Sequence, residues 1–172
     1  MQQGEVPTKT ETAYRTLRQA ILHTRLMPGA PLKLSALREA YGIGWTPLRE
    51  ALSRLEAEHL VILSANKGYT VAPVSLAELA DLTNARRHVE LPLLAESIAN
   101  GTEEWETALV AAHYRLSRCK SPAENPEDFA ITDWKDRHEA FHLALLAASR
   151  SKWLMRFYVQ TKEQMHRHHR IL

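Results

Sequence analysis

The amino-acid sequence predicts a mainly α-helical protein in two parts. Three observations support this prediction. Apolar residues recur every three to four positions along most of the chain, two short strand-like segments interrupt that pattern, and the pattern is helical throughout after Pro73. With 172 residues, 45% of them hydrophobic, the chain can bury a substantial core in one larger domain or two small ones.

Composition favours a reducing compartment. Cys119 is the only cysteine, so no intrachain disulfide can form, and no apolar run of about 20 residues or secretory signal is present. We therefore expect a cytoplasmic protein with no membrane partner. Residues 1–72 carry nine lysines and arginines against six acidic residues, whereas residues 73–172 carry thirteen against fourteen. This mildly basic first part could meet a polyanion.

The N-terminal part begins with two predicted helices. Alanine, leucine and isoleucine at helical spacing indicate a first helix over about residues 10–25, and Met27-Pro28-Gly29 should end it. A short second helix is expected at residues 34–41, with Ser35 as its N-cap. The letters YGIG that follow are typical of a tight turn, because glycine readily takes a positive φ.

A third helix and a hairpin complete this part. Thr46 is a suitable N-cap, and Pro47 fits the first position of the third helix. Strands are expected at residues 60–63 and 69–72, joined by a turn at Asn66-Lys67-Gly68. Helices, glycine turn, third helix and β-wing together predict a winged helix-turn-helix over residues 1–73.

Residues 74–172 are predicted to form an all-helical, antiparallel bundle. Ser75 should cap a long helix that Asn100-Gly101 ends, and Thr102 should open the next. A polar loop is expected at residues 120–127. The predicted helices span approximately residues 76–99, 103–118, 128–149 and 151–170.

A winged helix-turn-helix places its third helix in the major groove of DNA. Trp45, Thr46 and Arg49, at the start of that helix, would then face the DNA. Arginine suits the O6 and N7 atoms of guanine or a phosphate. Arg38 and Arg54 could reach the DNA backbone.

The tip of the wing offers a second DNA contact. Lys67 with Gly68 could approach the minor groove or a phosphate. An alternative interpretation is that the motif is only a scaffold. Arg49 would then pair with Glu50 or Glu56 on a solvated helix face.

The segment AYGIGWTPLREALSRLEAEHLV, followed by NKGYTV, resembles the signature of GntR-type bacterial transcriptional regulators. The resemblance covers about residues 10–73 and implies DNA binding. Two positions depart from the family pattern. Gly44-Trp45 replaces the usual Ser-Arg, so Trp45 would pack on a sugar or a thymine methyl group, and His59 replaces a glycine. The operator sequence therefore does not carry over from the family.

The segments ARRHVELPLLAESIA, HEAFHLALLAASRSKWL and YVQTKEQMHRHHRIL resemble the FCD effector domain of the FadR-like branch. The resemblance implies a small carboxylate effector, held in many members by a divalent metal on one Asp and three His. It places His142 on the metal and His138 at the Asp position. Residues four apart share a helix face, so both rings could meet one ion. Zn, Ni or Fe suits imidazole, and Mn a mixed carboxylate site.

Two features leave the metal set open. Relatives continue beyond the position of Leu172 and carry their two remaining metal histidines there, so the domain is incomplete relative to the family. His166, His168 or His169 could substitute, or this stretch could be a solvated, frayed last turn. Asp133 and Asp136 are other carboxylates nearby.

The resemblance also implies that Arg86 binds the carboxylate of the effector. The alternative is a salt bridge to Glu90, four residues on, or to Asp81. Tyr114 and His113 on the following helix could line the same cavity.

His138-Glu139-Ala140-Phe141-His142 also fits H-E-x-x-H, which can hold zinc beside a glutamate base in hydrolases. A third ligand would have to come from Glu163 or His166. No oxyanion-stabilising group or substrate cleft is evident, so we predict that the protein is not an enzyme.

The sequence therefore predicts a homodimeric, ligand-responsive transcription factor on a palindromic operator in double-stranded DNA. The resemblance implies a repressor that a small organic acid releases. Two alternatives remain: a zinc-dependent hydrolase, and a DNA binder whose helical domain senses no ligand.

Overall fold

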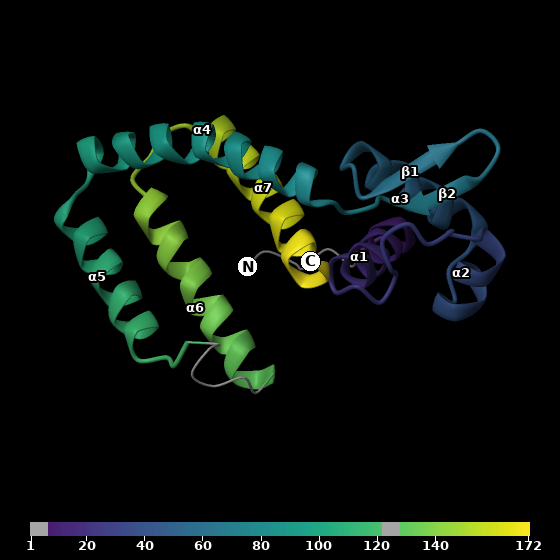
Figure 1. Ribbon diagram of the computed structural model, residues 1–172, viewed down its shortest axis with the longest axis horizontal. Coiled ribbons are helices and arrows are strands. Elements are labelled where there is room, and N and C mark those ends of the chain that lie inside the picture. The colour runs from purple at the N-terminus through teal and green to yellow at the C-terminus, as the bar shows by residue number, and fades with distance from the viewer. Residues whose placement is uncertain (1–6, 122–127) are drawn as a thin grey trace. The chain divides into compact units, whose positions relative to one another are not determined.

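A computed structural model describes residues 7–121 and 128–172, so residues 122–127 of the predicted polar loop lie outside the described part (Figure 1). The chain divides into two compact units. The first comprises Met1–Leu82 together with Glu163–Leu172, and the second comprises Thr83–Lys162. The sequence-based division at residues 73 and 74 stays a prediction. None of the helices in the described ranges is long and apolar enough to cross a membrane.

The first unit begins with α1 (Lys9–Leu22), which ends earlier than the apolar periodicity predicts. Thr8 caps α1, its side chain accepting a hydrogen bond from the backbone N–H of Glu11. The helix stops because Thr24 takes a φ of 58° and the N–H of Leu26 bonds to the carbonyl of Ala20. These are features of a left-handed helix ending, which glycine or asparagine usually makes.

Two predicted N-caps are wrong. Helix α2 (Leu34–Tyr41) begins before Ser35, and helix α3 (Trp45–Ala57) begins before Thr46. Lys33 and Gly44 occupy the cap positions, and neither makes a side-chain capping bond. Gly42, with a φ of 64°, forms the turn between the two helices as expected.

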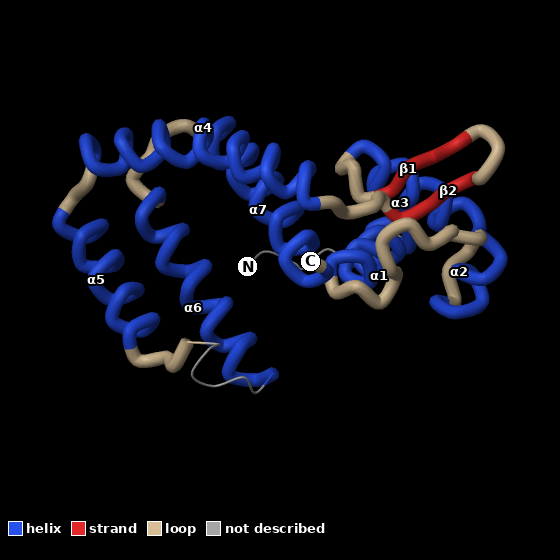
Figure 2. Tube along the Cα trace, viewed as in Figure 1, coloured by secondary structure: helices blue, strands red, loops and turns tan. Residues whose placement is uncertain are grey.

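The wing is an antiparallel hairpin of β1 (Val61–Ser64) and β2 (Gly68–Val71), shown in red in Figure 2. Val61 pairs with Val71 and Ser64 with Gly68, and the bounds of both strands lie one residue from the predicted ones. The predicted turn is confirmed, and Gly68 adopts a φ of 67°. The core of this unit consists of buried side chains from α1, α2, α3 and the hairpin, including Leu17, Ile21, Leu48, Leu52, Leu55, Val61 and Val71.

Four further helices follow: α4 (Leu76–Asn100), α5 (Glu103–Ser117), α6 (Asp128–Leu146) and α7 (Lys152–Ile171). The predicted caps Ser75 and Thr102 are confirmed, because their hydroxyl oxygens accept from the N–H groups of Glu78 and Trp105.

In the second unit, Leu93, Leu146 and Tyr158 form a buried cluster that joins α4, α6 and α7. Helices α5 and α6 run side by side in opposite directions (Figure 1), and the Trp105 indole N–H donates to the carbonyl of Ala144 at 2.8 Å. A mainly α-helical protein with a small winged hairpin is therefore confirmed.

Candidate DNA interface and effector site

Helix α3 separates an apolar face from a polar one. Leu48, Leu52 and Leu55 are buried in the core of the first unit, whereas Arg49 and Thr46 are exposed. Burial of the leucine face fixes the helix, so the opposite face is presented to solvent as a rigid surface. This arrangement suits a recognition helix, which needs a fixed backbone and free side chains.

Arg49 is available for an external partner. In the part of the chain that the structure describes, no carboxylate forms a salt bridge with Arg49. Glu50, one predicted alternative partner, instead accepts a hydrogen bond from the Thr10 hydroxyl at 2.6 Å. The intrahelical pairing that would make α3 a mere scaffold is therefore not formed.

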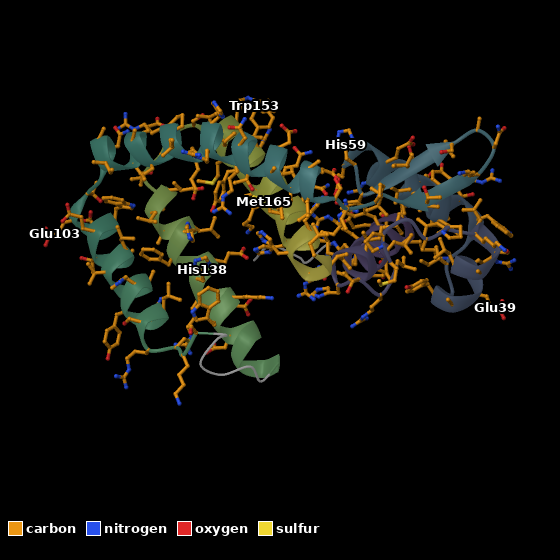
Figure 3. The ribbon with its side chains drawn as sticks, viewed as in Figure 1. Glu39, His59, Glu103, His138, Trp153 and Met165 are labelled. Atoms are coloured by element: carbon orange, nitrogen blue, oxygen red, sulfur yellow. The ribbon has the colours of Figure 1, made fainter. Side chains whose placement is uncertain are left out.

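Trp45 and Arg38 form a stacked pair beside the start of α3. The Trp45 ring is 45% exposed, and the Arg38 guanidinium carbon lies 5.2 Å from its centroid. Arg38 borders an open hollow of about 650 Å³, and Figure 3 labels Glu39 beside it. The residues that line the hollow are Ser35, Arg38, Glu39, Gly42, Ile43 and Gly44. A Cβ atom at Gly44 would meet nothing closer than Pro47 Cδ at 3.7 Å. A side chain would therefore fit at position 44, so packing does not require a glycine there.

The other predicted DNA contacts differ in availability. Lys67 and Gly68 at the wing tip are exposed. Arg54 is exposed but already engaged, because it donates to Glu11 at 2.8 Å and its guanidinium carbon lies 3.7 Å from the centroid of the Tyr14 ring. An approaching phosphate would have to compete with these two partners for Arg54.

The second unit contains a polar cluster around Arg86 on α4. The Arg86 guanidinium donates to both carboxylate oxygens of Glu90, at 2.9 and 3.2 Å, and to the Tyr158 hydroxyl at 3.3 Å. The Arg86 and Glu90 side chains are only 20% and 23% exposed. The predicted alternative, a salt bridge to Glu90, is thus formed. A carboxylate ligand could bind Arg86 only by sharing or displacing that partner.

The negative charge of the Glu90 carboxylate is strongly stabilised in this cluster. Contact with His142, whose Nδ1 atom lies 3.3 Å from Glu90 Oε1, and then hydrogen bonding to Arg86 lower the pKa of Glu90 to about 2. Burial raises the pKa of Tyr158, so its hydroxyl stays protonated. The cluster therefore presents a cation, an anion and a phenol within one hydrogen-bonded group.

His138 and His142 on α6 face each other, with their Nε2 atoms 3.3 Å apart. The Trp134 ring stacks on His138 at 4.6 Å between centroids and an interplanar angle of 14°, and Figure 3 labels His138 on α6. Burial, His142 and Arg86 lower the pKa of His138. Neutral imidazole is the form that binds a metal ion.

The described residues supply this pair of metal donors and no more. Among the side chains that the structure describes, those of residues 7–121 and 133–172, no group of three or more His, Cys, Asp or Glu could hold a metal ion. Asp133, which the sequence offers as a carboxylate ligand, accepts from Arg137 at 3.0 Å and from the Cys119 thiol at 3.2 Å. The histidine pair fits part of a metal site, with its other positions left to water or ligand.

The geometry around H-E-x-x-H does not suit hydrolysis. Glu139, the residue that would have to be the general base, forms an ion pair with Lys162. Glu163, one of the predicted third ligands, forms an ion pair with Arg18 in the first unit. A general base must be within reach of the bound water, and Glu139 is instead engaged by Lys162. Glu163 is likewise engaged by Arg18 and is not free to be the third ligand.

The tyrosine beside Arg86 is Tyr158, and the predicted effector residue Tyr114 has no described contact with that arginine. Tyr114 on α5 is 64% exposed, and no described contact joins it to Arg86. Tyr158 on α7 is the tyrosine that bonds to Arg86, and it is fully buried. Tyr158 begins the segment YVQTKEQMHRHHRIL that resembles the FCD domain, but no local spacing connects it with Arg86, which stands 72 residues away in the sequence.

The histidine-rich end of α7 is helical and only partly solvated, because His166 and His169 are exposed and the residues between them are not. Met165, Arg167 and His168 are buried, and Figure 3 labels Met165 on this helix. His168 Nε2 lies 3.0 Å from a carboxylate oxygen of Glu78, and its Nδ1 lies 2.8 Å from the carbonyl of Gln164. The sequence suggested either metal ligands or solvent exposure here. The structure gives His168 a packing role in the first unit instead.

A winged helix-turn-helix joined to a helical unit with a polar cluster is the architecture of a family of bacterial regulators. Residues 9–71 match the family described as bacterial regulatory proteins, gntR family, and residues 81–172 match the FCD domain. The chain belongs to the GntR family of bacterial transcriptional regulators and carries an FCD domain. Nothing in these matches supports the hydrolase alternative.

Two curated relatives give the resemblance more detail. The HTH-type transcriptional repressor GlaR of Escherichia coli (strain K12) is 39% identical over 83% of this chain and 64% of its own length. The HTH-type transcriptional regulator BphR of Paraburkholderia xenovorans (strain LB400) is 34% identical over 98% of this chain and 69% of its own length. The chain spans about two thirds of the length of these relatives.

Solved structures show the same fold. The E. coli protein McbR/YncC has a TM-score of 0.64 and 23% identity, covering 97% of this chain and 78% of that one. A GntR regulator from Rhodococcus sp. RHA1 has the same TM-score and identity, covering 91% and 73%.

Proposed function

We propose that this chain acts as a DNA-binding transcriptional regulator that contacts its operator through α3 and the wing. The observation that carries the proposal is the exposed, unpaired Arg49 on a helix whose other face is buried. Trp45 and Thr46 extend the same surface toward the start of the helix, the end that meets base edges in helix-turn-helix proteins. Lys67 at the wing tip would add a phosphate contact.

The regulator is proposed to repress transcription as a homodimer. GlaR, to which the chain is similar, is named a repressor. A two-fold dimer would place two copies of α3 on successive major-groove faces of a palindrome, about 34–36 Å apart. Because the two half-site contacts are linked in one dimer, the affinity for the whole palindrome would greatly exceed that for a single half-site.

The second unit is proposed to bind a small organic acid at Arg86. Arginine matches a carboxylate with two parallel hydrogen bonds, which is the geometry Glu90 now uses. An effector carboxylate that replaced Glu90 would leave the Glu90 carboxylate against His142, and the Tyr158 hydroxyl, which accepts from Arg86, could donate its O–H to the effector. The acid would therefore change the contacts of α4, α6 and α7 together.

A divalent metal ion on His138 and His142 is part of this proposal. The two Nε2 atoms are close enough to bind one ion, and imidazole ligands favour Zn, Ni or Fe. A carboxylate effector would supply a further oxygen ligand, in which case Mn also fits. The ion would raise the affinity for an acid by adding positive charge beside Arg86.

One observation favours a second candidate, a DNA binder that senses no ligand. Arg86 already has a carboxylate partner in Glu90 and a further hydrogen bond to Tyr158, so its charge is paired without a ligand. The two candidates differ in the response to small molecules. Only the ligand-responsive regulator gains thermal stability from an organic acid, because the acid binds the folded state.

The test starts from a pool of random-sequence DNA duplexes. The purified chain should enrich a palindromic sequence, and its affinity for that duplex should fall steeply with salt. Melting curves with a panel of dicarboxylates and sugar acids, with and without divalent metal, then separate the two candidates. Failure to enrich any duplex contradicts the proposed function. Enrichment without any thermal shift supports the ligand-insensitive candidate.

A further inference from the structure

The buried guanidinium of Arg167, near the end of α7, binds the segment that follows the wing. It donates to the carbonyl of Ala72 at 2.7 Å and to the carbonyl of Pro73 at 3.1 Å. These two residues come directly after β2 and lead into α4. The segment between the winged motif and the long helix is thus fixed by side-chain hydrogen bonds, whereas a free tether would leave its carbonyls to water.

Neighbouring residues of α7 hold the same unit at other points. Glu163 forms an ion pair with Arg18 of α1, and the Gln164 side-chain amide donates at 2.9 Å to the carbonyl of Glu58, which ends α3. His168, which is fully buried, meets Glu78 on the first turn of α4. The end of α7 therefore contacts both ends of the winged motif, and Arg167 lies between these contacts.

Stability alone does not explain why an arginine stands at position 167. Its side chain is fully buried, and no described carboxylate forms a salt bridge with it. Its Nε atom is buried with no hydrogen-bond partner among the described residues. Burial also lowers the pKa of the guanidinium, with Glu78 opposing that effect. A well-packed apolar side chain often stabilises such a position as well or better.

Arginine offers geometry that an apolar residue lacks. Its planar guanidinium points several N–H groups in fixed directions, so it can hold two successive carbonyls in one relative orientation. At Ala72 and Pro73 that orientation sets the direction in which the chain leaves the wing. The buried guanidinium of Arg167 therefore serves to fix the direction of this segment.

We propose that Arg167 is a positioning residue for DNA binding: it fixes residues 72–73 against α7 and so holds the winged motif in one orientation relative to the end of that helix. The proposal rests on the proposed function. Helix α7 is continuous from Lys152 to Ile171, so the helix that holds this segment also carries Tyr158 of the Arg86 cluster. The hydrogen bonds from Arg167 to residues 72–73 thereby connect the winged motif to the helix that carries Tyr158.

A dimer whose winged motifs are held in fixed orientation should demand one spacing between half-sites. The test uses the full chain, the palindrome selected from random duplexes, and copies of it with two or five base pairs inserted between the half-sites. The variants are Arg167→Met, Arg167→Lys and, as a matched control, Arg170→Met. Arg170 is an exposed arginine on the same helix with no hydrogen bond or ion pair in the described structure.

The wild-type chain and Arg170→Met are expected to lose roughly tenfold or more in affinity when the spacing changes. Arg167→Met should lose less than about threefold, while its affinity for a single half-site stays within twofold of wild type. Arg167→Lys keeps one donor but not the fork, so its discrimination should be intermediate. A purely structural role for Arg167 would lower the melting temperature without relaxing the spacing requirement.

Each possible outcome bears on the proposal. Wild-type spacing discrimination in Arg167→Met overturns the positioning role, even if that variant melts earlier. An equal loss of affinity on every duplex, single half-sites included, also overturns it, because that pattern reports general loss of folded protein. If Arg167→Met does not fold, Arg167→Lys decides: discrimination equal to wild type contradicts the proposal, and reduced discrimination supports it. A wild-type chain that selects no duplex instead refutes the proposed function itself.

Discussion

The Nε2 atoms of His138 and His142 lie 3.3 Å apart, one turn from each other on α6. Two imidazole nitrogens bound to one ion at about 2.0–2.1 Å each are separated by roughly 2.8–3.0 Å in octahedral geometry and roughly 3.3–3.4 Å in tetrahedral geometry. The pair is therefore spaced for a shared ion without any movement of the helix.

This spacing makes metal content the first prediction. The purified chain is expected to carry a divalent metal, and His142→Ala should lower the metal-to-protein ratio severalfold because it removes one of the two donors. Elemental analysis after extensive dialysis measures the ratio, with His88→Ala, an exposed histidine on α4, as the control. A wild-type chain free of metal would contradict the proposal of a metal on this pair.

Arg49→Ala should weaken operator binding by roughly 1–3 kcal/mol, because Arg49 is exposed, unpaired and directed away from the core. Fluorescence anisotropy with the selected duplex measures the loss. Arg87→Ala, which removes an exposed arginine on α4, serves as a matched control and should leave affinity nearly unchanged. Equal affinity in wild type and Arg49→Ala would remove Arg49 from the interface.

Trp45 and Arg38 should act together on DNA. The stacked indole limits the positions of the guanidinium, so each residue helps the other to bind. Trp45→Ala and Arg38→Ala are each expected to reduce affinity, and the double variant to lose less than the sum by about 0.5–1 kcal/mol. Strict additivity in this double-mutant cycle would show that the pair does not function as a unit.

His59→Gly should stabilise the protein. His59 has a φ of 58°, a left-handed conformation that costs a residue with a Cβ roughly 1–2 kcal/mol. Part of that gain is lost to the greater freedom of glycine when unfolded, so we expect about 0.5–1 kcal/mol. Chemical denaturation measures it. His59→Ala retains the strained conformation and is expected to show no such gain, which separates the backbone effect from loss of the imidazole.

Tyr14→Phe should change stability at alkaline pH. Burial, and then the hydrogen bond from its hydroxyl to Glu58, raise the pKa of Tyr14 above its ordinary value of 10.0. A group with a raised pKa in the folded state contributes stability below pH 10 and loses it as pH rises through the folded-state value. The free energy of unfolding should therefore fall above pH 10 in the wild type and fall less in Tyr14→Phe. Parallel pH profiles for the two proteins would contradict this.

Local sequence patterns were sufficient for most of the fold. The apolar periodicity placed every helix, and Asn66-Lys67-Gly68 placed the turn of the wing, because both signals act over a few residues. Helix starts were less well determined. Ser35 and Thr46 are good capping residues, yet α2 and α3 begin one residue earlier, since packing of their leucine faces decides where the first turn forms.

In the candidate sites, contacts between residues close in sequence were predictable, and contacts between distant segments were not. The pair of Arg86 with Glu90 was foreseeable as an alternative, because residues four apart share a helix face. The facing of His138 and His142 follows from the same spacing. Tyr158 was not foreseeable, since its bond to Arg86 joins segments 72 residues apart. Tyr114 has the same side chain but lies on a solvent-exposed part of α5.

By itself, the sequence determined the class of fold and the facing of His138 with His142, and it predicted candidate DNA contacts, because all of these depend on residue type and short-range spacing. Only the tertiary structure decided what the polar end of α7 does. Arg167 and His168 look solvated in the sequence, yet both are fully buried. A polar side chain can be buried when donors or acceptors from distant segments satisfy it, and those of Ala72, Pro73 and Glu78 come together only in the folded chain.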